Sequence, residues 1–125
     1  KLYKYNDNYI YTPYKDYYGV NEVNFSALME KYQEGGLKYQ QSDDLPFGVS
    51  WNTSKNYTDG YNVTNWAHFN IKNIEICRTI EFPFAYSNGE LVYPDKLRKF
   101  GHGMARAIRA YVEGEVLVTE MPKVE

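Results

Sequence analysis

The chain has 125 residues, of which 14 are Lys or Arg and 16 are Asp or Glu, so its formal net charge is −2 at pH 7. This length is typical of one domain and too short for two full domains. A net charge so near zero gives no electrostatic case for binding nucleic acid or an anionic membrane. No apolar run approaches the roughly 20 residues of a membrane-spanning helix. We therefore expect no nucleic-acid partner and no membrane span.

The first half of the chain predicts a strand, a helix and a long loop. Residues 2–12 alternate in the manner of a strand. Asn24 is placed to cap a helix over Phe25–Gln33, which a glycine pair at 35–36 ends. Residues 40–61 are rich in Asp, Asn, Gly and other turn-forming residues, and this composition predicts a loop.

A short helix and a second strand are predicted next. Asn62 or Thr64 is placed to cap the short helix. Three apolar side chains of this helix share one face: Val63, Trp66 and Ala67. Residues 74–82 then alternate as a strand that Pro83 ends.

The clearest periodicity follows Pro94. Apolar and small side chains recur there at helical spacing, namely Leu97, Phe100, Gly101, Met104, Ala105, Ile108, Tyr111 and Val112. Pro94 suits the first turn of a helix, and Gly114 suits its end. We expect this stripe to pack on a sheet that contains residues 74–82, with the basic side chains in solvent and 115–125 as a tail. A strand followed by such a helix favours an α/β fold.

The two histidines do not have the spacing of metal ligands. His68 and His102 are 34 positions apart, and both lie off the apolar stripes of their predicted helices. We therefore interpret both as surface residues and assign no metal ligand. The small residues on either side of His102 are interpreted as allowing close packing of helix on sheet. The acidic pair Asp43-Asp44 is interpreted as a solvated turn.

Tyrosine is unusually frequent, with 14 residues in the chain. A tyrosine ring combines a large contact area with a polar hydroxyl, which suits wet clefts and the binding of peptides or carbohydrates. Four Asn-x-Ser/Thr sequons begin at Asn24, Asn52, Asn56 and Asn62. They favour a secreted or periplasmic location, with a cytoplasmic one as the alternative. Cys77 is the single cysteine, so no internal disulfide is possible.

Glu81 is the candidate catalytic residue. It stands at the carboxyl end of an apolar strand, directly before the sequence Phe82-Pro83. A carboxylate there must be paired or must face a cleft, because isolated burial is costly. Active sites of open α/β sheets lie at such strand ends, and a glutamate with a raised pKa is a common general acid/base. The alternative is a salt-bridged or exposed strand end.

Two segments resemble the C-terminal part of the zinc carboxypeptidase family. They are residues 78–85, which read RTIEFPFA, and residues 92–107, which read VYPDKLRKFGHGMARA. The family includes carboxypeptidase A-like peptidases and succinylglutamate desuccinylase-like relatives. In it, a Thr-x-Glu-x-Pro strand end carries the general acid/base, and Glu81 matches that glutamate. Tyr57 resembles the family's flexible-loop tyrosine, which binds substrate.

The resemblance implies a fold and an activity. The chain would be the C-terminal portion of a mixed-sheet, phosphorylase/hydrolase-like α/β domain, so that residues 1–125 form a single partial domain. The complete domain would be a zinc-dependent hydrolase that cleaves a C-terminal amide bond of a peptide or an acylated amino acid. Zinc would polarise the carbonyl and activate a water molecule, while Glu81 moves the proton and Tyr57 binds the substrate.

The zinc ligands are not expected in this chain. The family's His-x-x-Glu motif is absent, since neither His68 nor His102 has Glu three positions later. The isolated chain is therefore expected to be inactive. We expect it to be completed by the remaining part of the catalytic domain or by a homo-oligomer. The alternative function is a non-catalytic, secreted, Tyr-rich module that binds peptide or carbohydrate.

Overall fold

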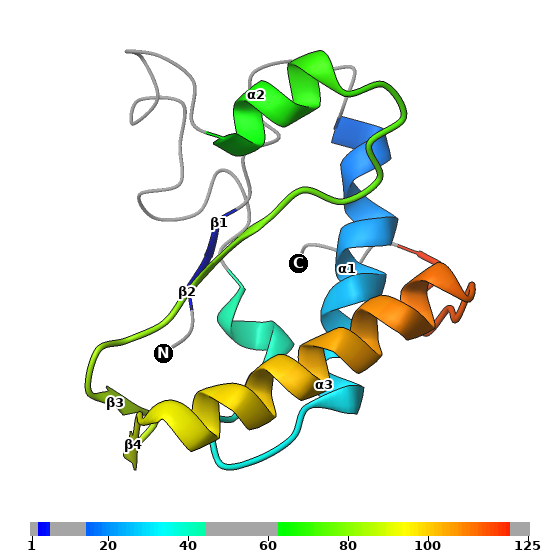
Figure 1. Cartoon of the computed structure of the whole chain (residues 1–125). Coiled ribbons are helices and arrows are strands. Elements are labelled where there is room, and N and C mark those ends of the chain that lie inside the picture. Colours follow the sequence, from blue (N-terminus) through cyan, green and yellow to red (C-terminus); the bar gives the residue numbers. More distant parts are fainter. Residues whose placement is uncertain (1–2, 6–14, 45–62, 121–125) are drawn as a thin grey trace.

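The computed structural model describes residues 3–5, 15–44 and 63–120, which form a mixed helical and strand structure (Figure 1). Two long helices dominate it. Helix α1 (Lys15–Tyr32) and helix α3 (Pro94–Val112) cross and pack against each other. A one-turn 3-10 helix η2 (Gln41–Asp43) follows α1, and a short helix α2 (Val63–Asn70) precedes the second half of the chain. No helix in these three stretches is long and apolar enough to cross a membrane.

The strands form two small antiparallel sheets. β1 (Tyr3–Tyr5) pairs with β2 (Thr79–Glu81), and Tyr3 stands opposite Glu81. β3 (Tyr86–Ser87) and β4 (Glu90–Leu91) form a hairpin just before α3. The prediction of a strand over 74–82 is correct only for its last part. Of the strand expected over 2–12, residues 3–5 are confirmed and the others lie outside the described residues.

Helix α1 begins earlier than predicted. It starts at Lys15, so Asn24 lies in its middle and the prediction of Asn24 as an N-cap is wrong. The buried Asn24 side chain instead binds the segment after α3: its Nδ2 donates to the Glu115 carbonyl at 3.0 Å, and its Oδ1 accepts from the Leu117 amide at 2.6 Å. The predicted end of the helix is confirmed to within one residue, and Gly35 after it has a φ of +80°.

Helix α3 has the predicted bounds but a different buried face. It begins at Pro94, and Gly114 after it has a φ of +86°. Its buried residues are Phe100, Gly103, Ala107 and Ala110. The predicted stripe is wrong at four positions, which are exposed: Leu97 (37%), Ala105, Ile108 (47%) and Val112 (78%).

The close approach of α1 and α3 explains why the buried face of α3 differs from the predicted one. A Cβ atom on Gly103 would lie 2.7 Å from the Tyr32 carbonyl oxygen, so only glycine fits where α3 crosses the end of α1. Three of the four buried residues of α3 are accordingly small, namely Gly103, Ala107 and Ala110. The prediction that this helix packs on a sheet is wrong, because its main contact is with α1.

The core lies between these helices. It consists of Phe25, Leu28, Met29, Leu37, Tyr39, Phe100, Ala107 and Ala110. Ile76 and Ile80 pack against it from the segment that contains β2. Full burial of a large apolar side chain contributes about 1.5–3 kcal/mol, so this cluster is the main source of stability in the described residues. Of the predicted apolar face of α2, only Ala67 is buried, whereas Val63 and Trp66 are exposed.

Candidate functional site

The segment around β2 presents Glu81 on its outer face. Side chains of a strand point alternately to its two faces, and here Arg78, Ile80 and Phe82 turn toward the helices. Ile80 packs on the core, and the Phe82 ring, which is 40% exposed, meets Phe100 edge to face with centroids 5.0 Å apart. Thr79 and Glu81 are exposed. Glu81 therefore has direct access to solvent from a strand that is anchored on its opposite face.

Active sites at strand ends are typical of open α/β sheets, in which the carboxyl ends of parallel strands line a crevice. β2 instead pairs antiparallel with β1, in a sheet of two strands within the described residues. Whether Glu81 catalyses a reaction therefore depends on its own exposure and support, and not on sheet topology.

A buried ion pair anchors this segment to α1. The Arg78 guanidinium pairs through Nε with Glu22 Oε2, and its Nη1 donates to Ser26 Oγ at 2.6 Å. The second oxygen of Glu22 accepts the Cys77 amide at 3.2 Å. The Arg78 and Glu22 side chains are only 8% and 2% exposed. Buried charges are tolerated when they are paired and hydrogen-bonded. Here the ion pair matches the two charges, and the hydrogen bonds with Ser26 and Cys77 are made by the other atoms of the two side chains.

The network continues to Asp44. Its Oδ2 accepts the Ser26 hydroxyl and its Oδ1 accepts the Tyr39 hydroxyl, both at 2.6 Å. Arg78 Nη1 lies 3.7 Å from the same carboxylate. The interpretation of Asp43-Asp44 as a solvated turn is therefore wrong for Asp44, which joins the buried cluster. Sequence reasoning missed the cluster because its members are far apart in the chain and share no local pattern.

The structure tests the prediction made for His102 but not those made for His68 and Tyr57. His102 is confirmed as a surface residue, with its side chain 68% exposed and Nδ1 2.8 Å from Glu34 Oε2. Hydrogen bonds from His102 and from Arg106 lower the pKa of Glu34. The side chain of His68 and the whole of Tyr57 lie outside the described residues. Among the residues that are described, no group of three or more His, Cys, Asp or Glu side chains is placed to hold a metal ion.

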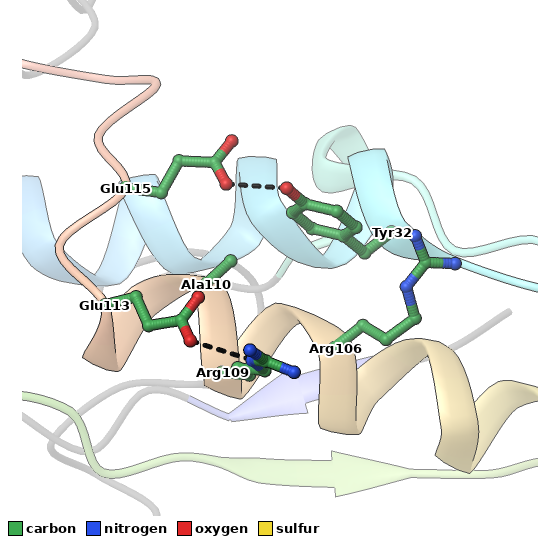
Figure 2. Close-up of a pocket in the computed structure, with 6 residues that line it drawn as sticks. All are labelled: Tyr32, Arg106, Arg109, Ala110, Glu113 and Glu115. Carbon is green, nitrogen blue, oxygen red and sulfur yellow. Dashed lines mark hydrogen bonds and ion pairs between the residues drawn. The ribbon is translucent and has the colours of Figure 1, made fainter.

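A shallow pocket of about 240 Å³ lies where the ends of α1 and α3 meet the chain that follows α3 (Figure 2). It is lined by Tyr32, Arg106, Arg109, Ala110, Glu113 and Glu115. The Tyr32 hydroxyl donates to Glu115 at 2.6 Å, and Arg109 Nε donates to Glu113 at 2.8 Å. The Arg106 guanidinium lies 5.2 Å from the centre of the Tyr32 ring. The other two charged side chains are paired with residues outside the lining, Arg106 with Glu34 and Glu115 with Lys31. The pocket therefore presents no unmatched charge.

No family model, curated protein or solved structure matches this chain. Glu81 is an exposed carboxylate on a well-anchored strand, and the pocket in Figure 2 does not include it. A carboxylate that is open to water on an anchored strand can accept and return a proton.

Proposed function

We propose that this chain is the C-terminal part of a zinc-dependent metallocarboxypeptidase-like hydrolase, in which Glu81 is the general acid/base. The reaction is cleavage of a C-terminal amide bond in a peptide or an acylated amino acid. The observation that carries the proposal is the exposed Glu81 on a segment whose opposite face is anchored by Arg78 and Phe82. The resemblance of residues 78–85 and 92–107 to that family supports it.

In this proposal the zinc ligands belong to polypeptide outside the described residues, and no step is assigned to a metal held here. Tyr57 is proposed to bind substrate. The remaining part of the catalytic domain is the proposed partner, with a homo-oligomer as the alternative, in a secreted or periplasmic protein.

The proposal is tested in the full-length protein. Zinc content and release of C-terminal residues from peptides and acylated amino acids are measured for the unmodified protein and for Glu81→Gln. The amide keeps the shape of the side chain but cannot accept a proton as a base, so turnover is expected to fall by about 10²–10⁴-fold, with zinc content unchanged. Full activity of Glu81→Gln contradicts the assignment.

Glu75→Gln is the matched control. Glu75 lies six positions before Glu81, is also exposed, and accepts a hydrogen bond from the Tyr111 hydroxyl at 2.8 Å. The oxygen of a glutamine side chain can accept the same bond. Turnover of this variant is therefore expected to equal that of the unmodified protein.

The second candidate is a non-catalytic module that binds peptide or carbohydrate. It is favoured by exposed aromatic rings on and beside the β3–β4 hairpin, where Phe84 is fully exposed and Tyr86 and Tyr93 are 63% and 44% exposed. Titration with peptides and oligosaccharides tests it. Binding that Tyr86→Ala weakens and Glu81→Gln leaves intact, without any turnover, would favour this module over the hydrolase.

A further inference from the structure

The buried Arg78 has no part in the chemistry proposed for Glu81, yet it lies three positions before it on the same segment. Its side chain is 8% exposed, and its ion-pair partner Glu22 is 2% exposed. Replacing a buried ion pair by apolar side chains of similar volume is often neutral for stability. The pair is therefore better explained by the geometry it imposes than by the stability it adds.

The contacts of Arg78 fix both the direction and the position of the segment. Its guanidinium reaches Glu22 and Ser26, which lie one turn apart on α1. Glu22 also accepts the backbone amide of Cys77. One carboxylate thus holds a side chain and the adjacent backbone together. Hydrogen bonds are directional, so the Arg78 Nη1–Ser26 bond and the Cys77–Glu22 bond oppose rotation of the segment about its axis.

We propose that Arg78 is a positioning residue for Glu81, an inference that rests on the proposed function. Arg78, Ile80 and Phe82 hold the inner face of the segment through the ion pair, the core and Phe100 respectively. Because successive side chains alternate, holding this face keeps Glu81 directed outward. Of these three contacts, the Arg78 cluster is the one made of directional polar bonds.

The test measures kcat and KM per folded, zinc-loaded molecule of the full-length protein. Arg78→Met is expected to lower kcat by about tenfold to a hundredfold with little change in KM, because substrate binding does not use Arg78. Arg78→Lys keeps the charge and one bond, and is expected to recover part of the loss. Ser26→Ala removes one bond to the guanidinium, and its smaller loss of kcat provides the test if Arg78→Met does not fold. Arg106→Met, at an exposed arginine of α3, is the control and is expected to leave kcat unchanged.

Amide hydrogen exchange provides a readout that does not depend on activity. Arg78→Lys and Ser26→Ala are expected to speed exchange at residues 79–81 and not at residues 100–110 of α3. Unchanged kcat in both variants, with unchanged exchange at 79–81, overturns the positioning role. Absence of zinc and of any turnover that depends on Glu81 overturns the proposed function instead, and the exchange rates then decide whether Arg78 fixes the strand.

Discussion

The interior and the surface of this structure both contain arginine–carboxylate ion pairs, but in different surroundings. Inside, Arg78 is nearly covered and joins α1 to the β2 segment. Outside, Arg98 pairs with Asp95 and Arg109 pairs with Glu113 along α3, with every one of these side chains at least 60% exposed. Water and salt screen the outer pairs, whereas a buried charge that loses its partner stays desolvated. Burial, and not the number of ion pairs, therefore decides which of these pairs the fold depends on.

The largest expected effect comes from removing the inner arginine. Arg78→Met leaves Glu22 buried without its cation, and loss of one partner of a buried pair costs about 3–5 kcal/mol. Arg106→Met is the matched change outside, where the side chain is 51% exposed and pairs with Glu34. We expect no resolved loss of stability in that control. Urea unfolding of both variants measures the difference, and equal losses would contradict the comparison.

Two glycines of α3 extend the comparison from charge to packing. Gly103 faces α1, and a Cβ atom there would meet backbone atoms at 2.7–2.9 Å, whereas Gly101 has nothing within 4 Å. Gly103→Ala is expected to destabilise the protein by about 1–3 kcal/mol through overpacking. Gly101→Ala should stabilise it by about 0.5–1 kcal/mol, because alanine is the better helix former. Thermal unfolding checks the opposite signs, and a stabilising Gly103→Ala would show that the helices move apart at little cost.

Helix α3 shows which features of the fold could be predicted from the sequence and which could not. The ends of α3 follow from local rules, since proline suits a first turn and a glycine with positive φ suits a helix end, and both were predicted correctly. The face that α3 buries was not, because Gly103 looks like a gap in an apolar stripe until the partner helix is known. Local patterns determine where an element ends, and the neighbouring element determines which of its faces is buried.

The candidate site also has one part that could be predicted from the sequence and one part that could not. Glu81 could be selected because its neighbours in sequence mark a strand end, and the structure places it at the end of β2. Its support could not be predicted, since Glu22 and Arg78 are 56 positions apart and each alone resembles an ordinary surface residue. Asn24 was misassigned for a related reason. A side chain that can cap a helix can equally bind a distant backbone.

Asn24 provides the third prediction. Its buried side chain makes hydrogen bonds with the backbone of Glu115, Leu117 and Val118. Asn24→Ala leaves these backbone groups without their partner and is expected to cost about 1–2 kcal/mol. Asn70→Ala is the matched control, because Asn70 is exposed and bonds only locally to the Trp66 carbonyl among the contacts described. Faster hydrogen exchange at residues 117–118 in Asn24→Ala alone would confirm the role, and equal stability of the two variants would contradict it.

The smallest expected effect lies on the outer surface and depends on pH. Hydrogen bonds from His102 and from Arg106 lower the pKa of Glu34 in the folded protein. Folding therefore favours the ionised carboxylate. The resulting stabilisation is complete above the ordinary glutamate pKa of about 4.3 and is lost as the pH falls through the lower, folded value. Glu34→Gln is expected to lose less stability than the unmodified protein between pH 5 and the acid limit of folding, and His102→Gln to fall between the two because Arg106 remains. Melting temperatures measured across that range decide the point. If the melting temperature of Glu34→Gln falls with pH as steeply as that of the unmodified protein, the hydrogen bonds of Glu34 with His102 and Arg106 have no effect on stability.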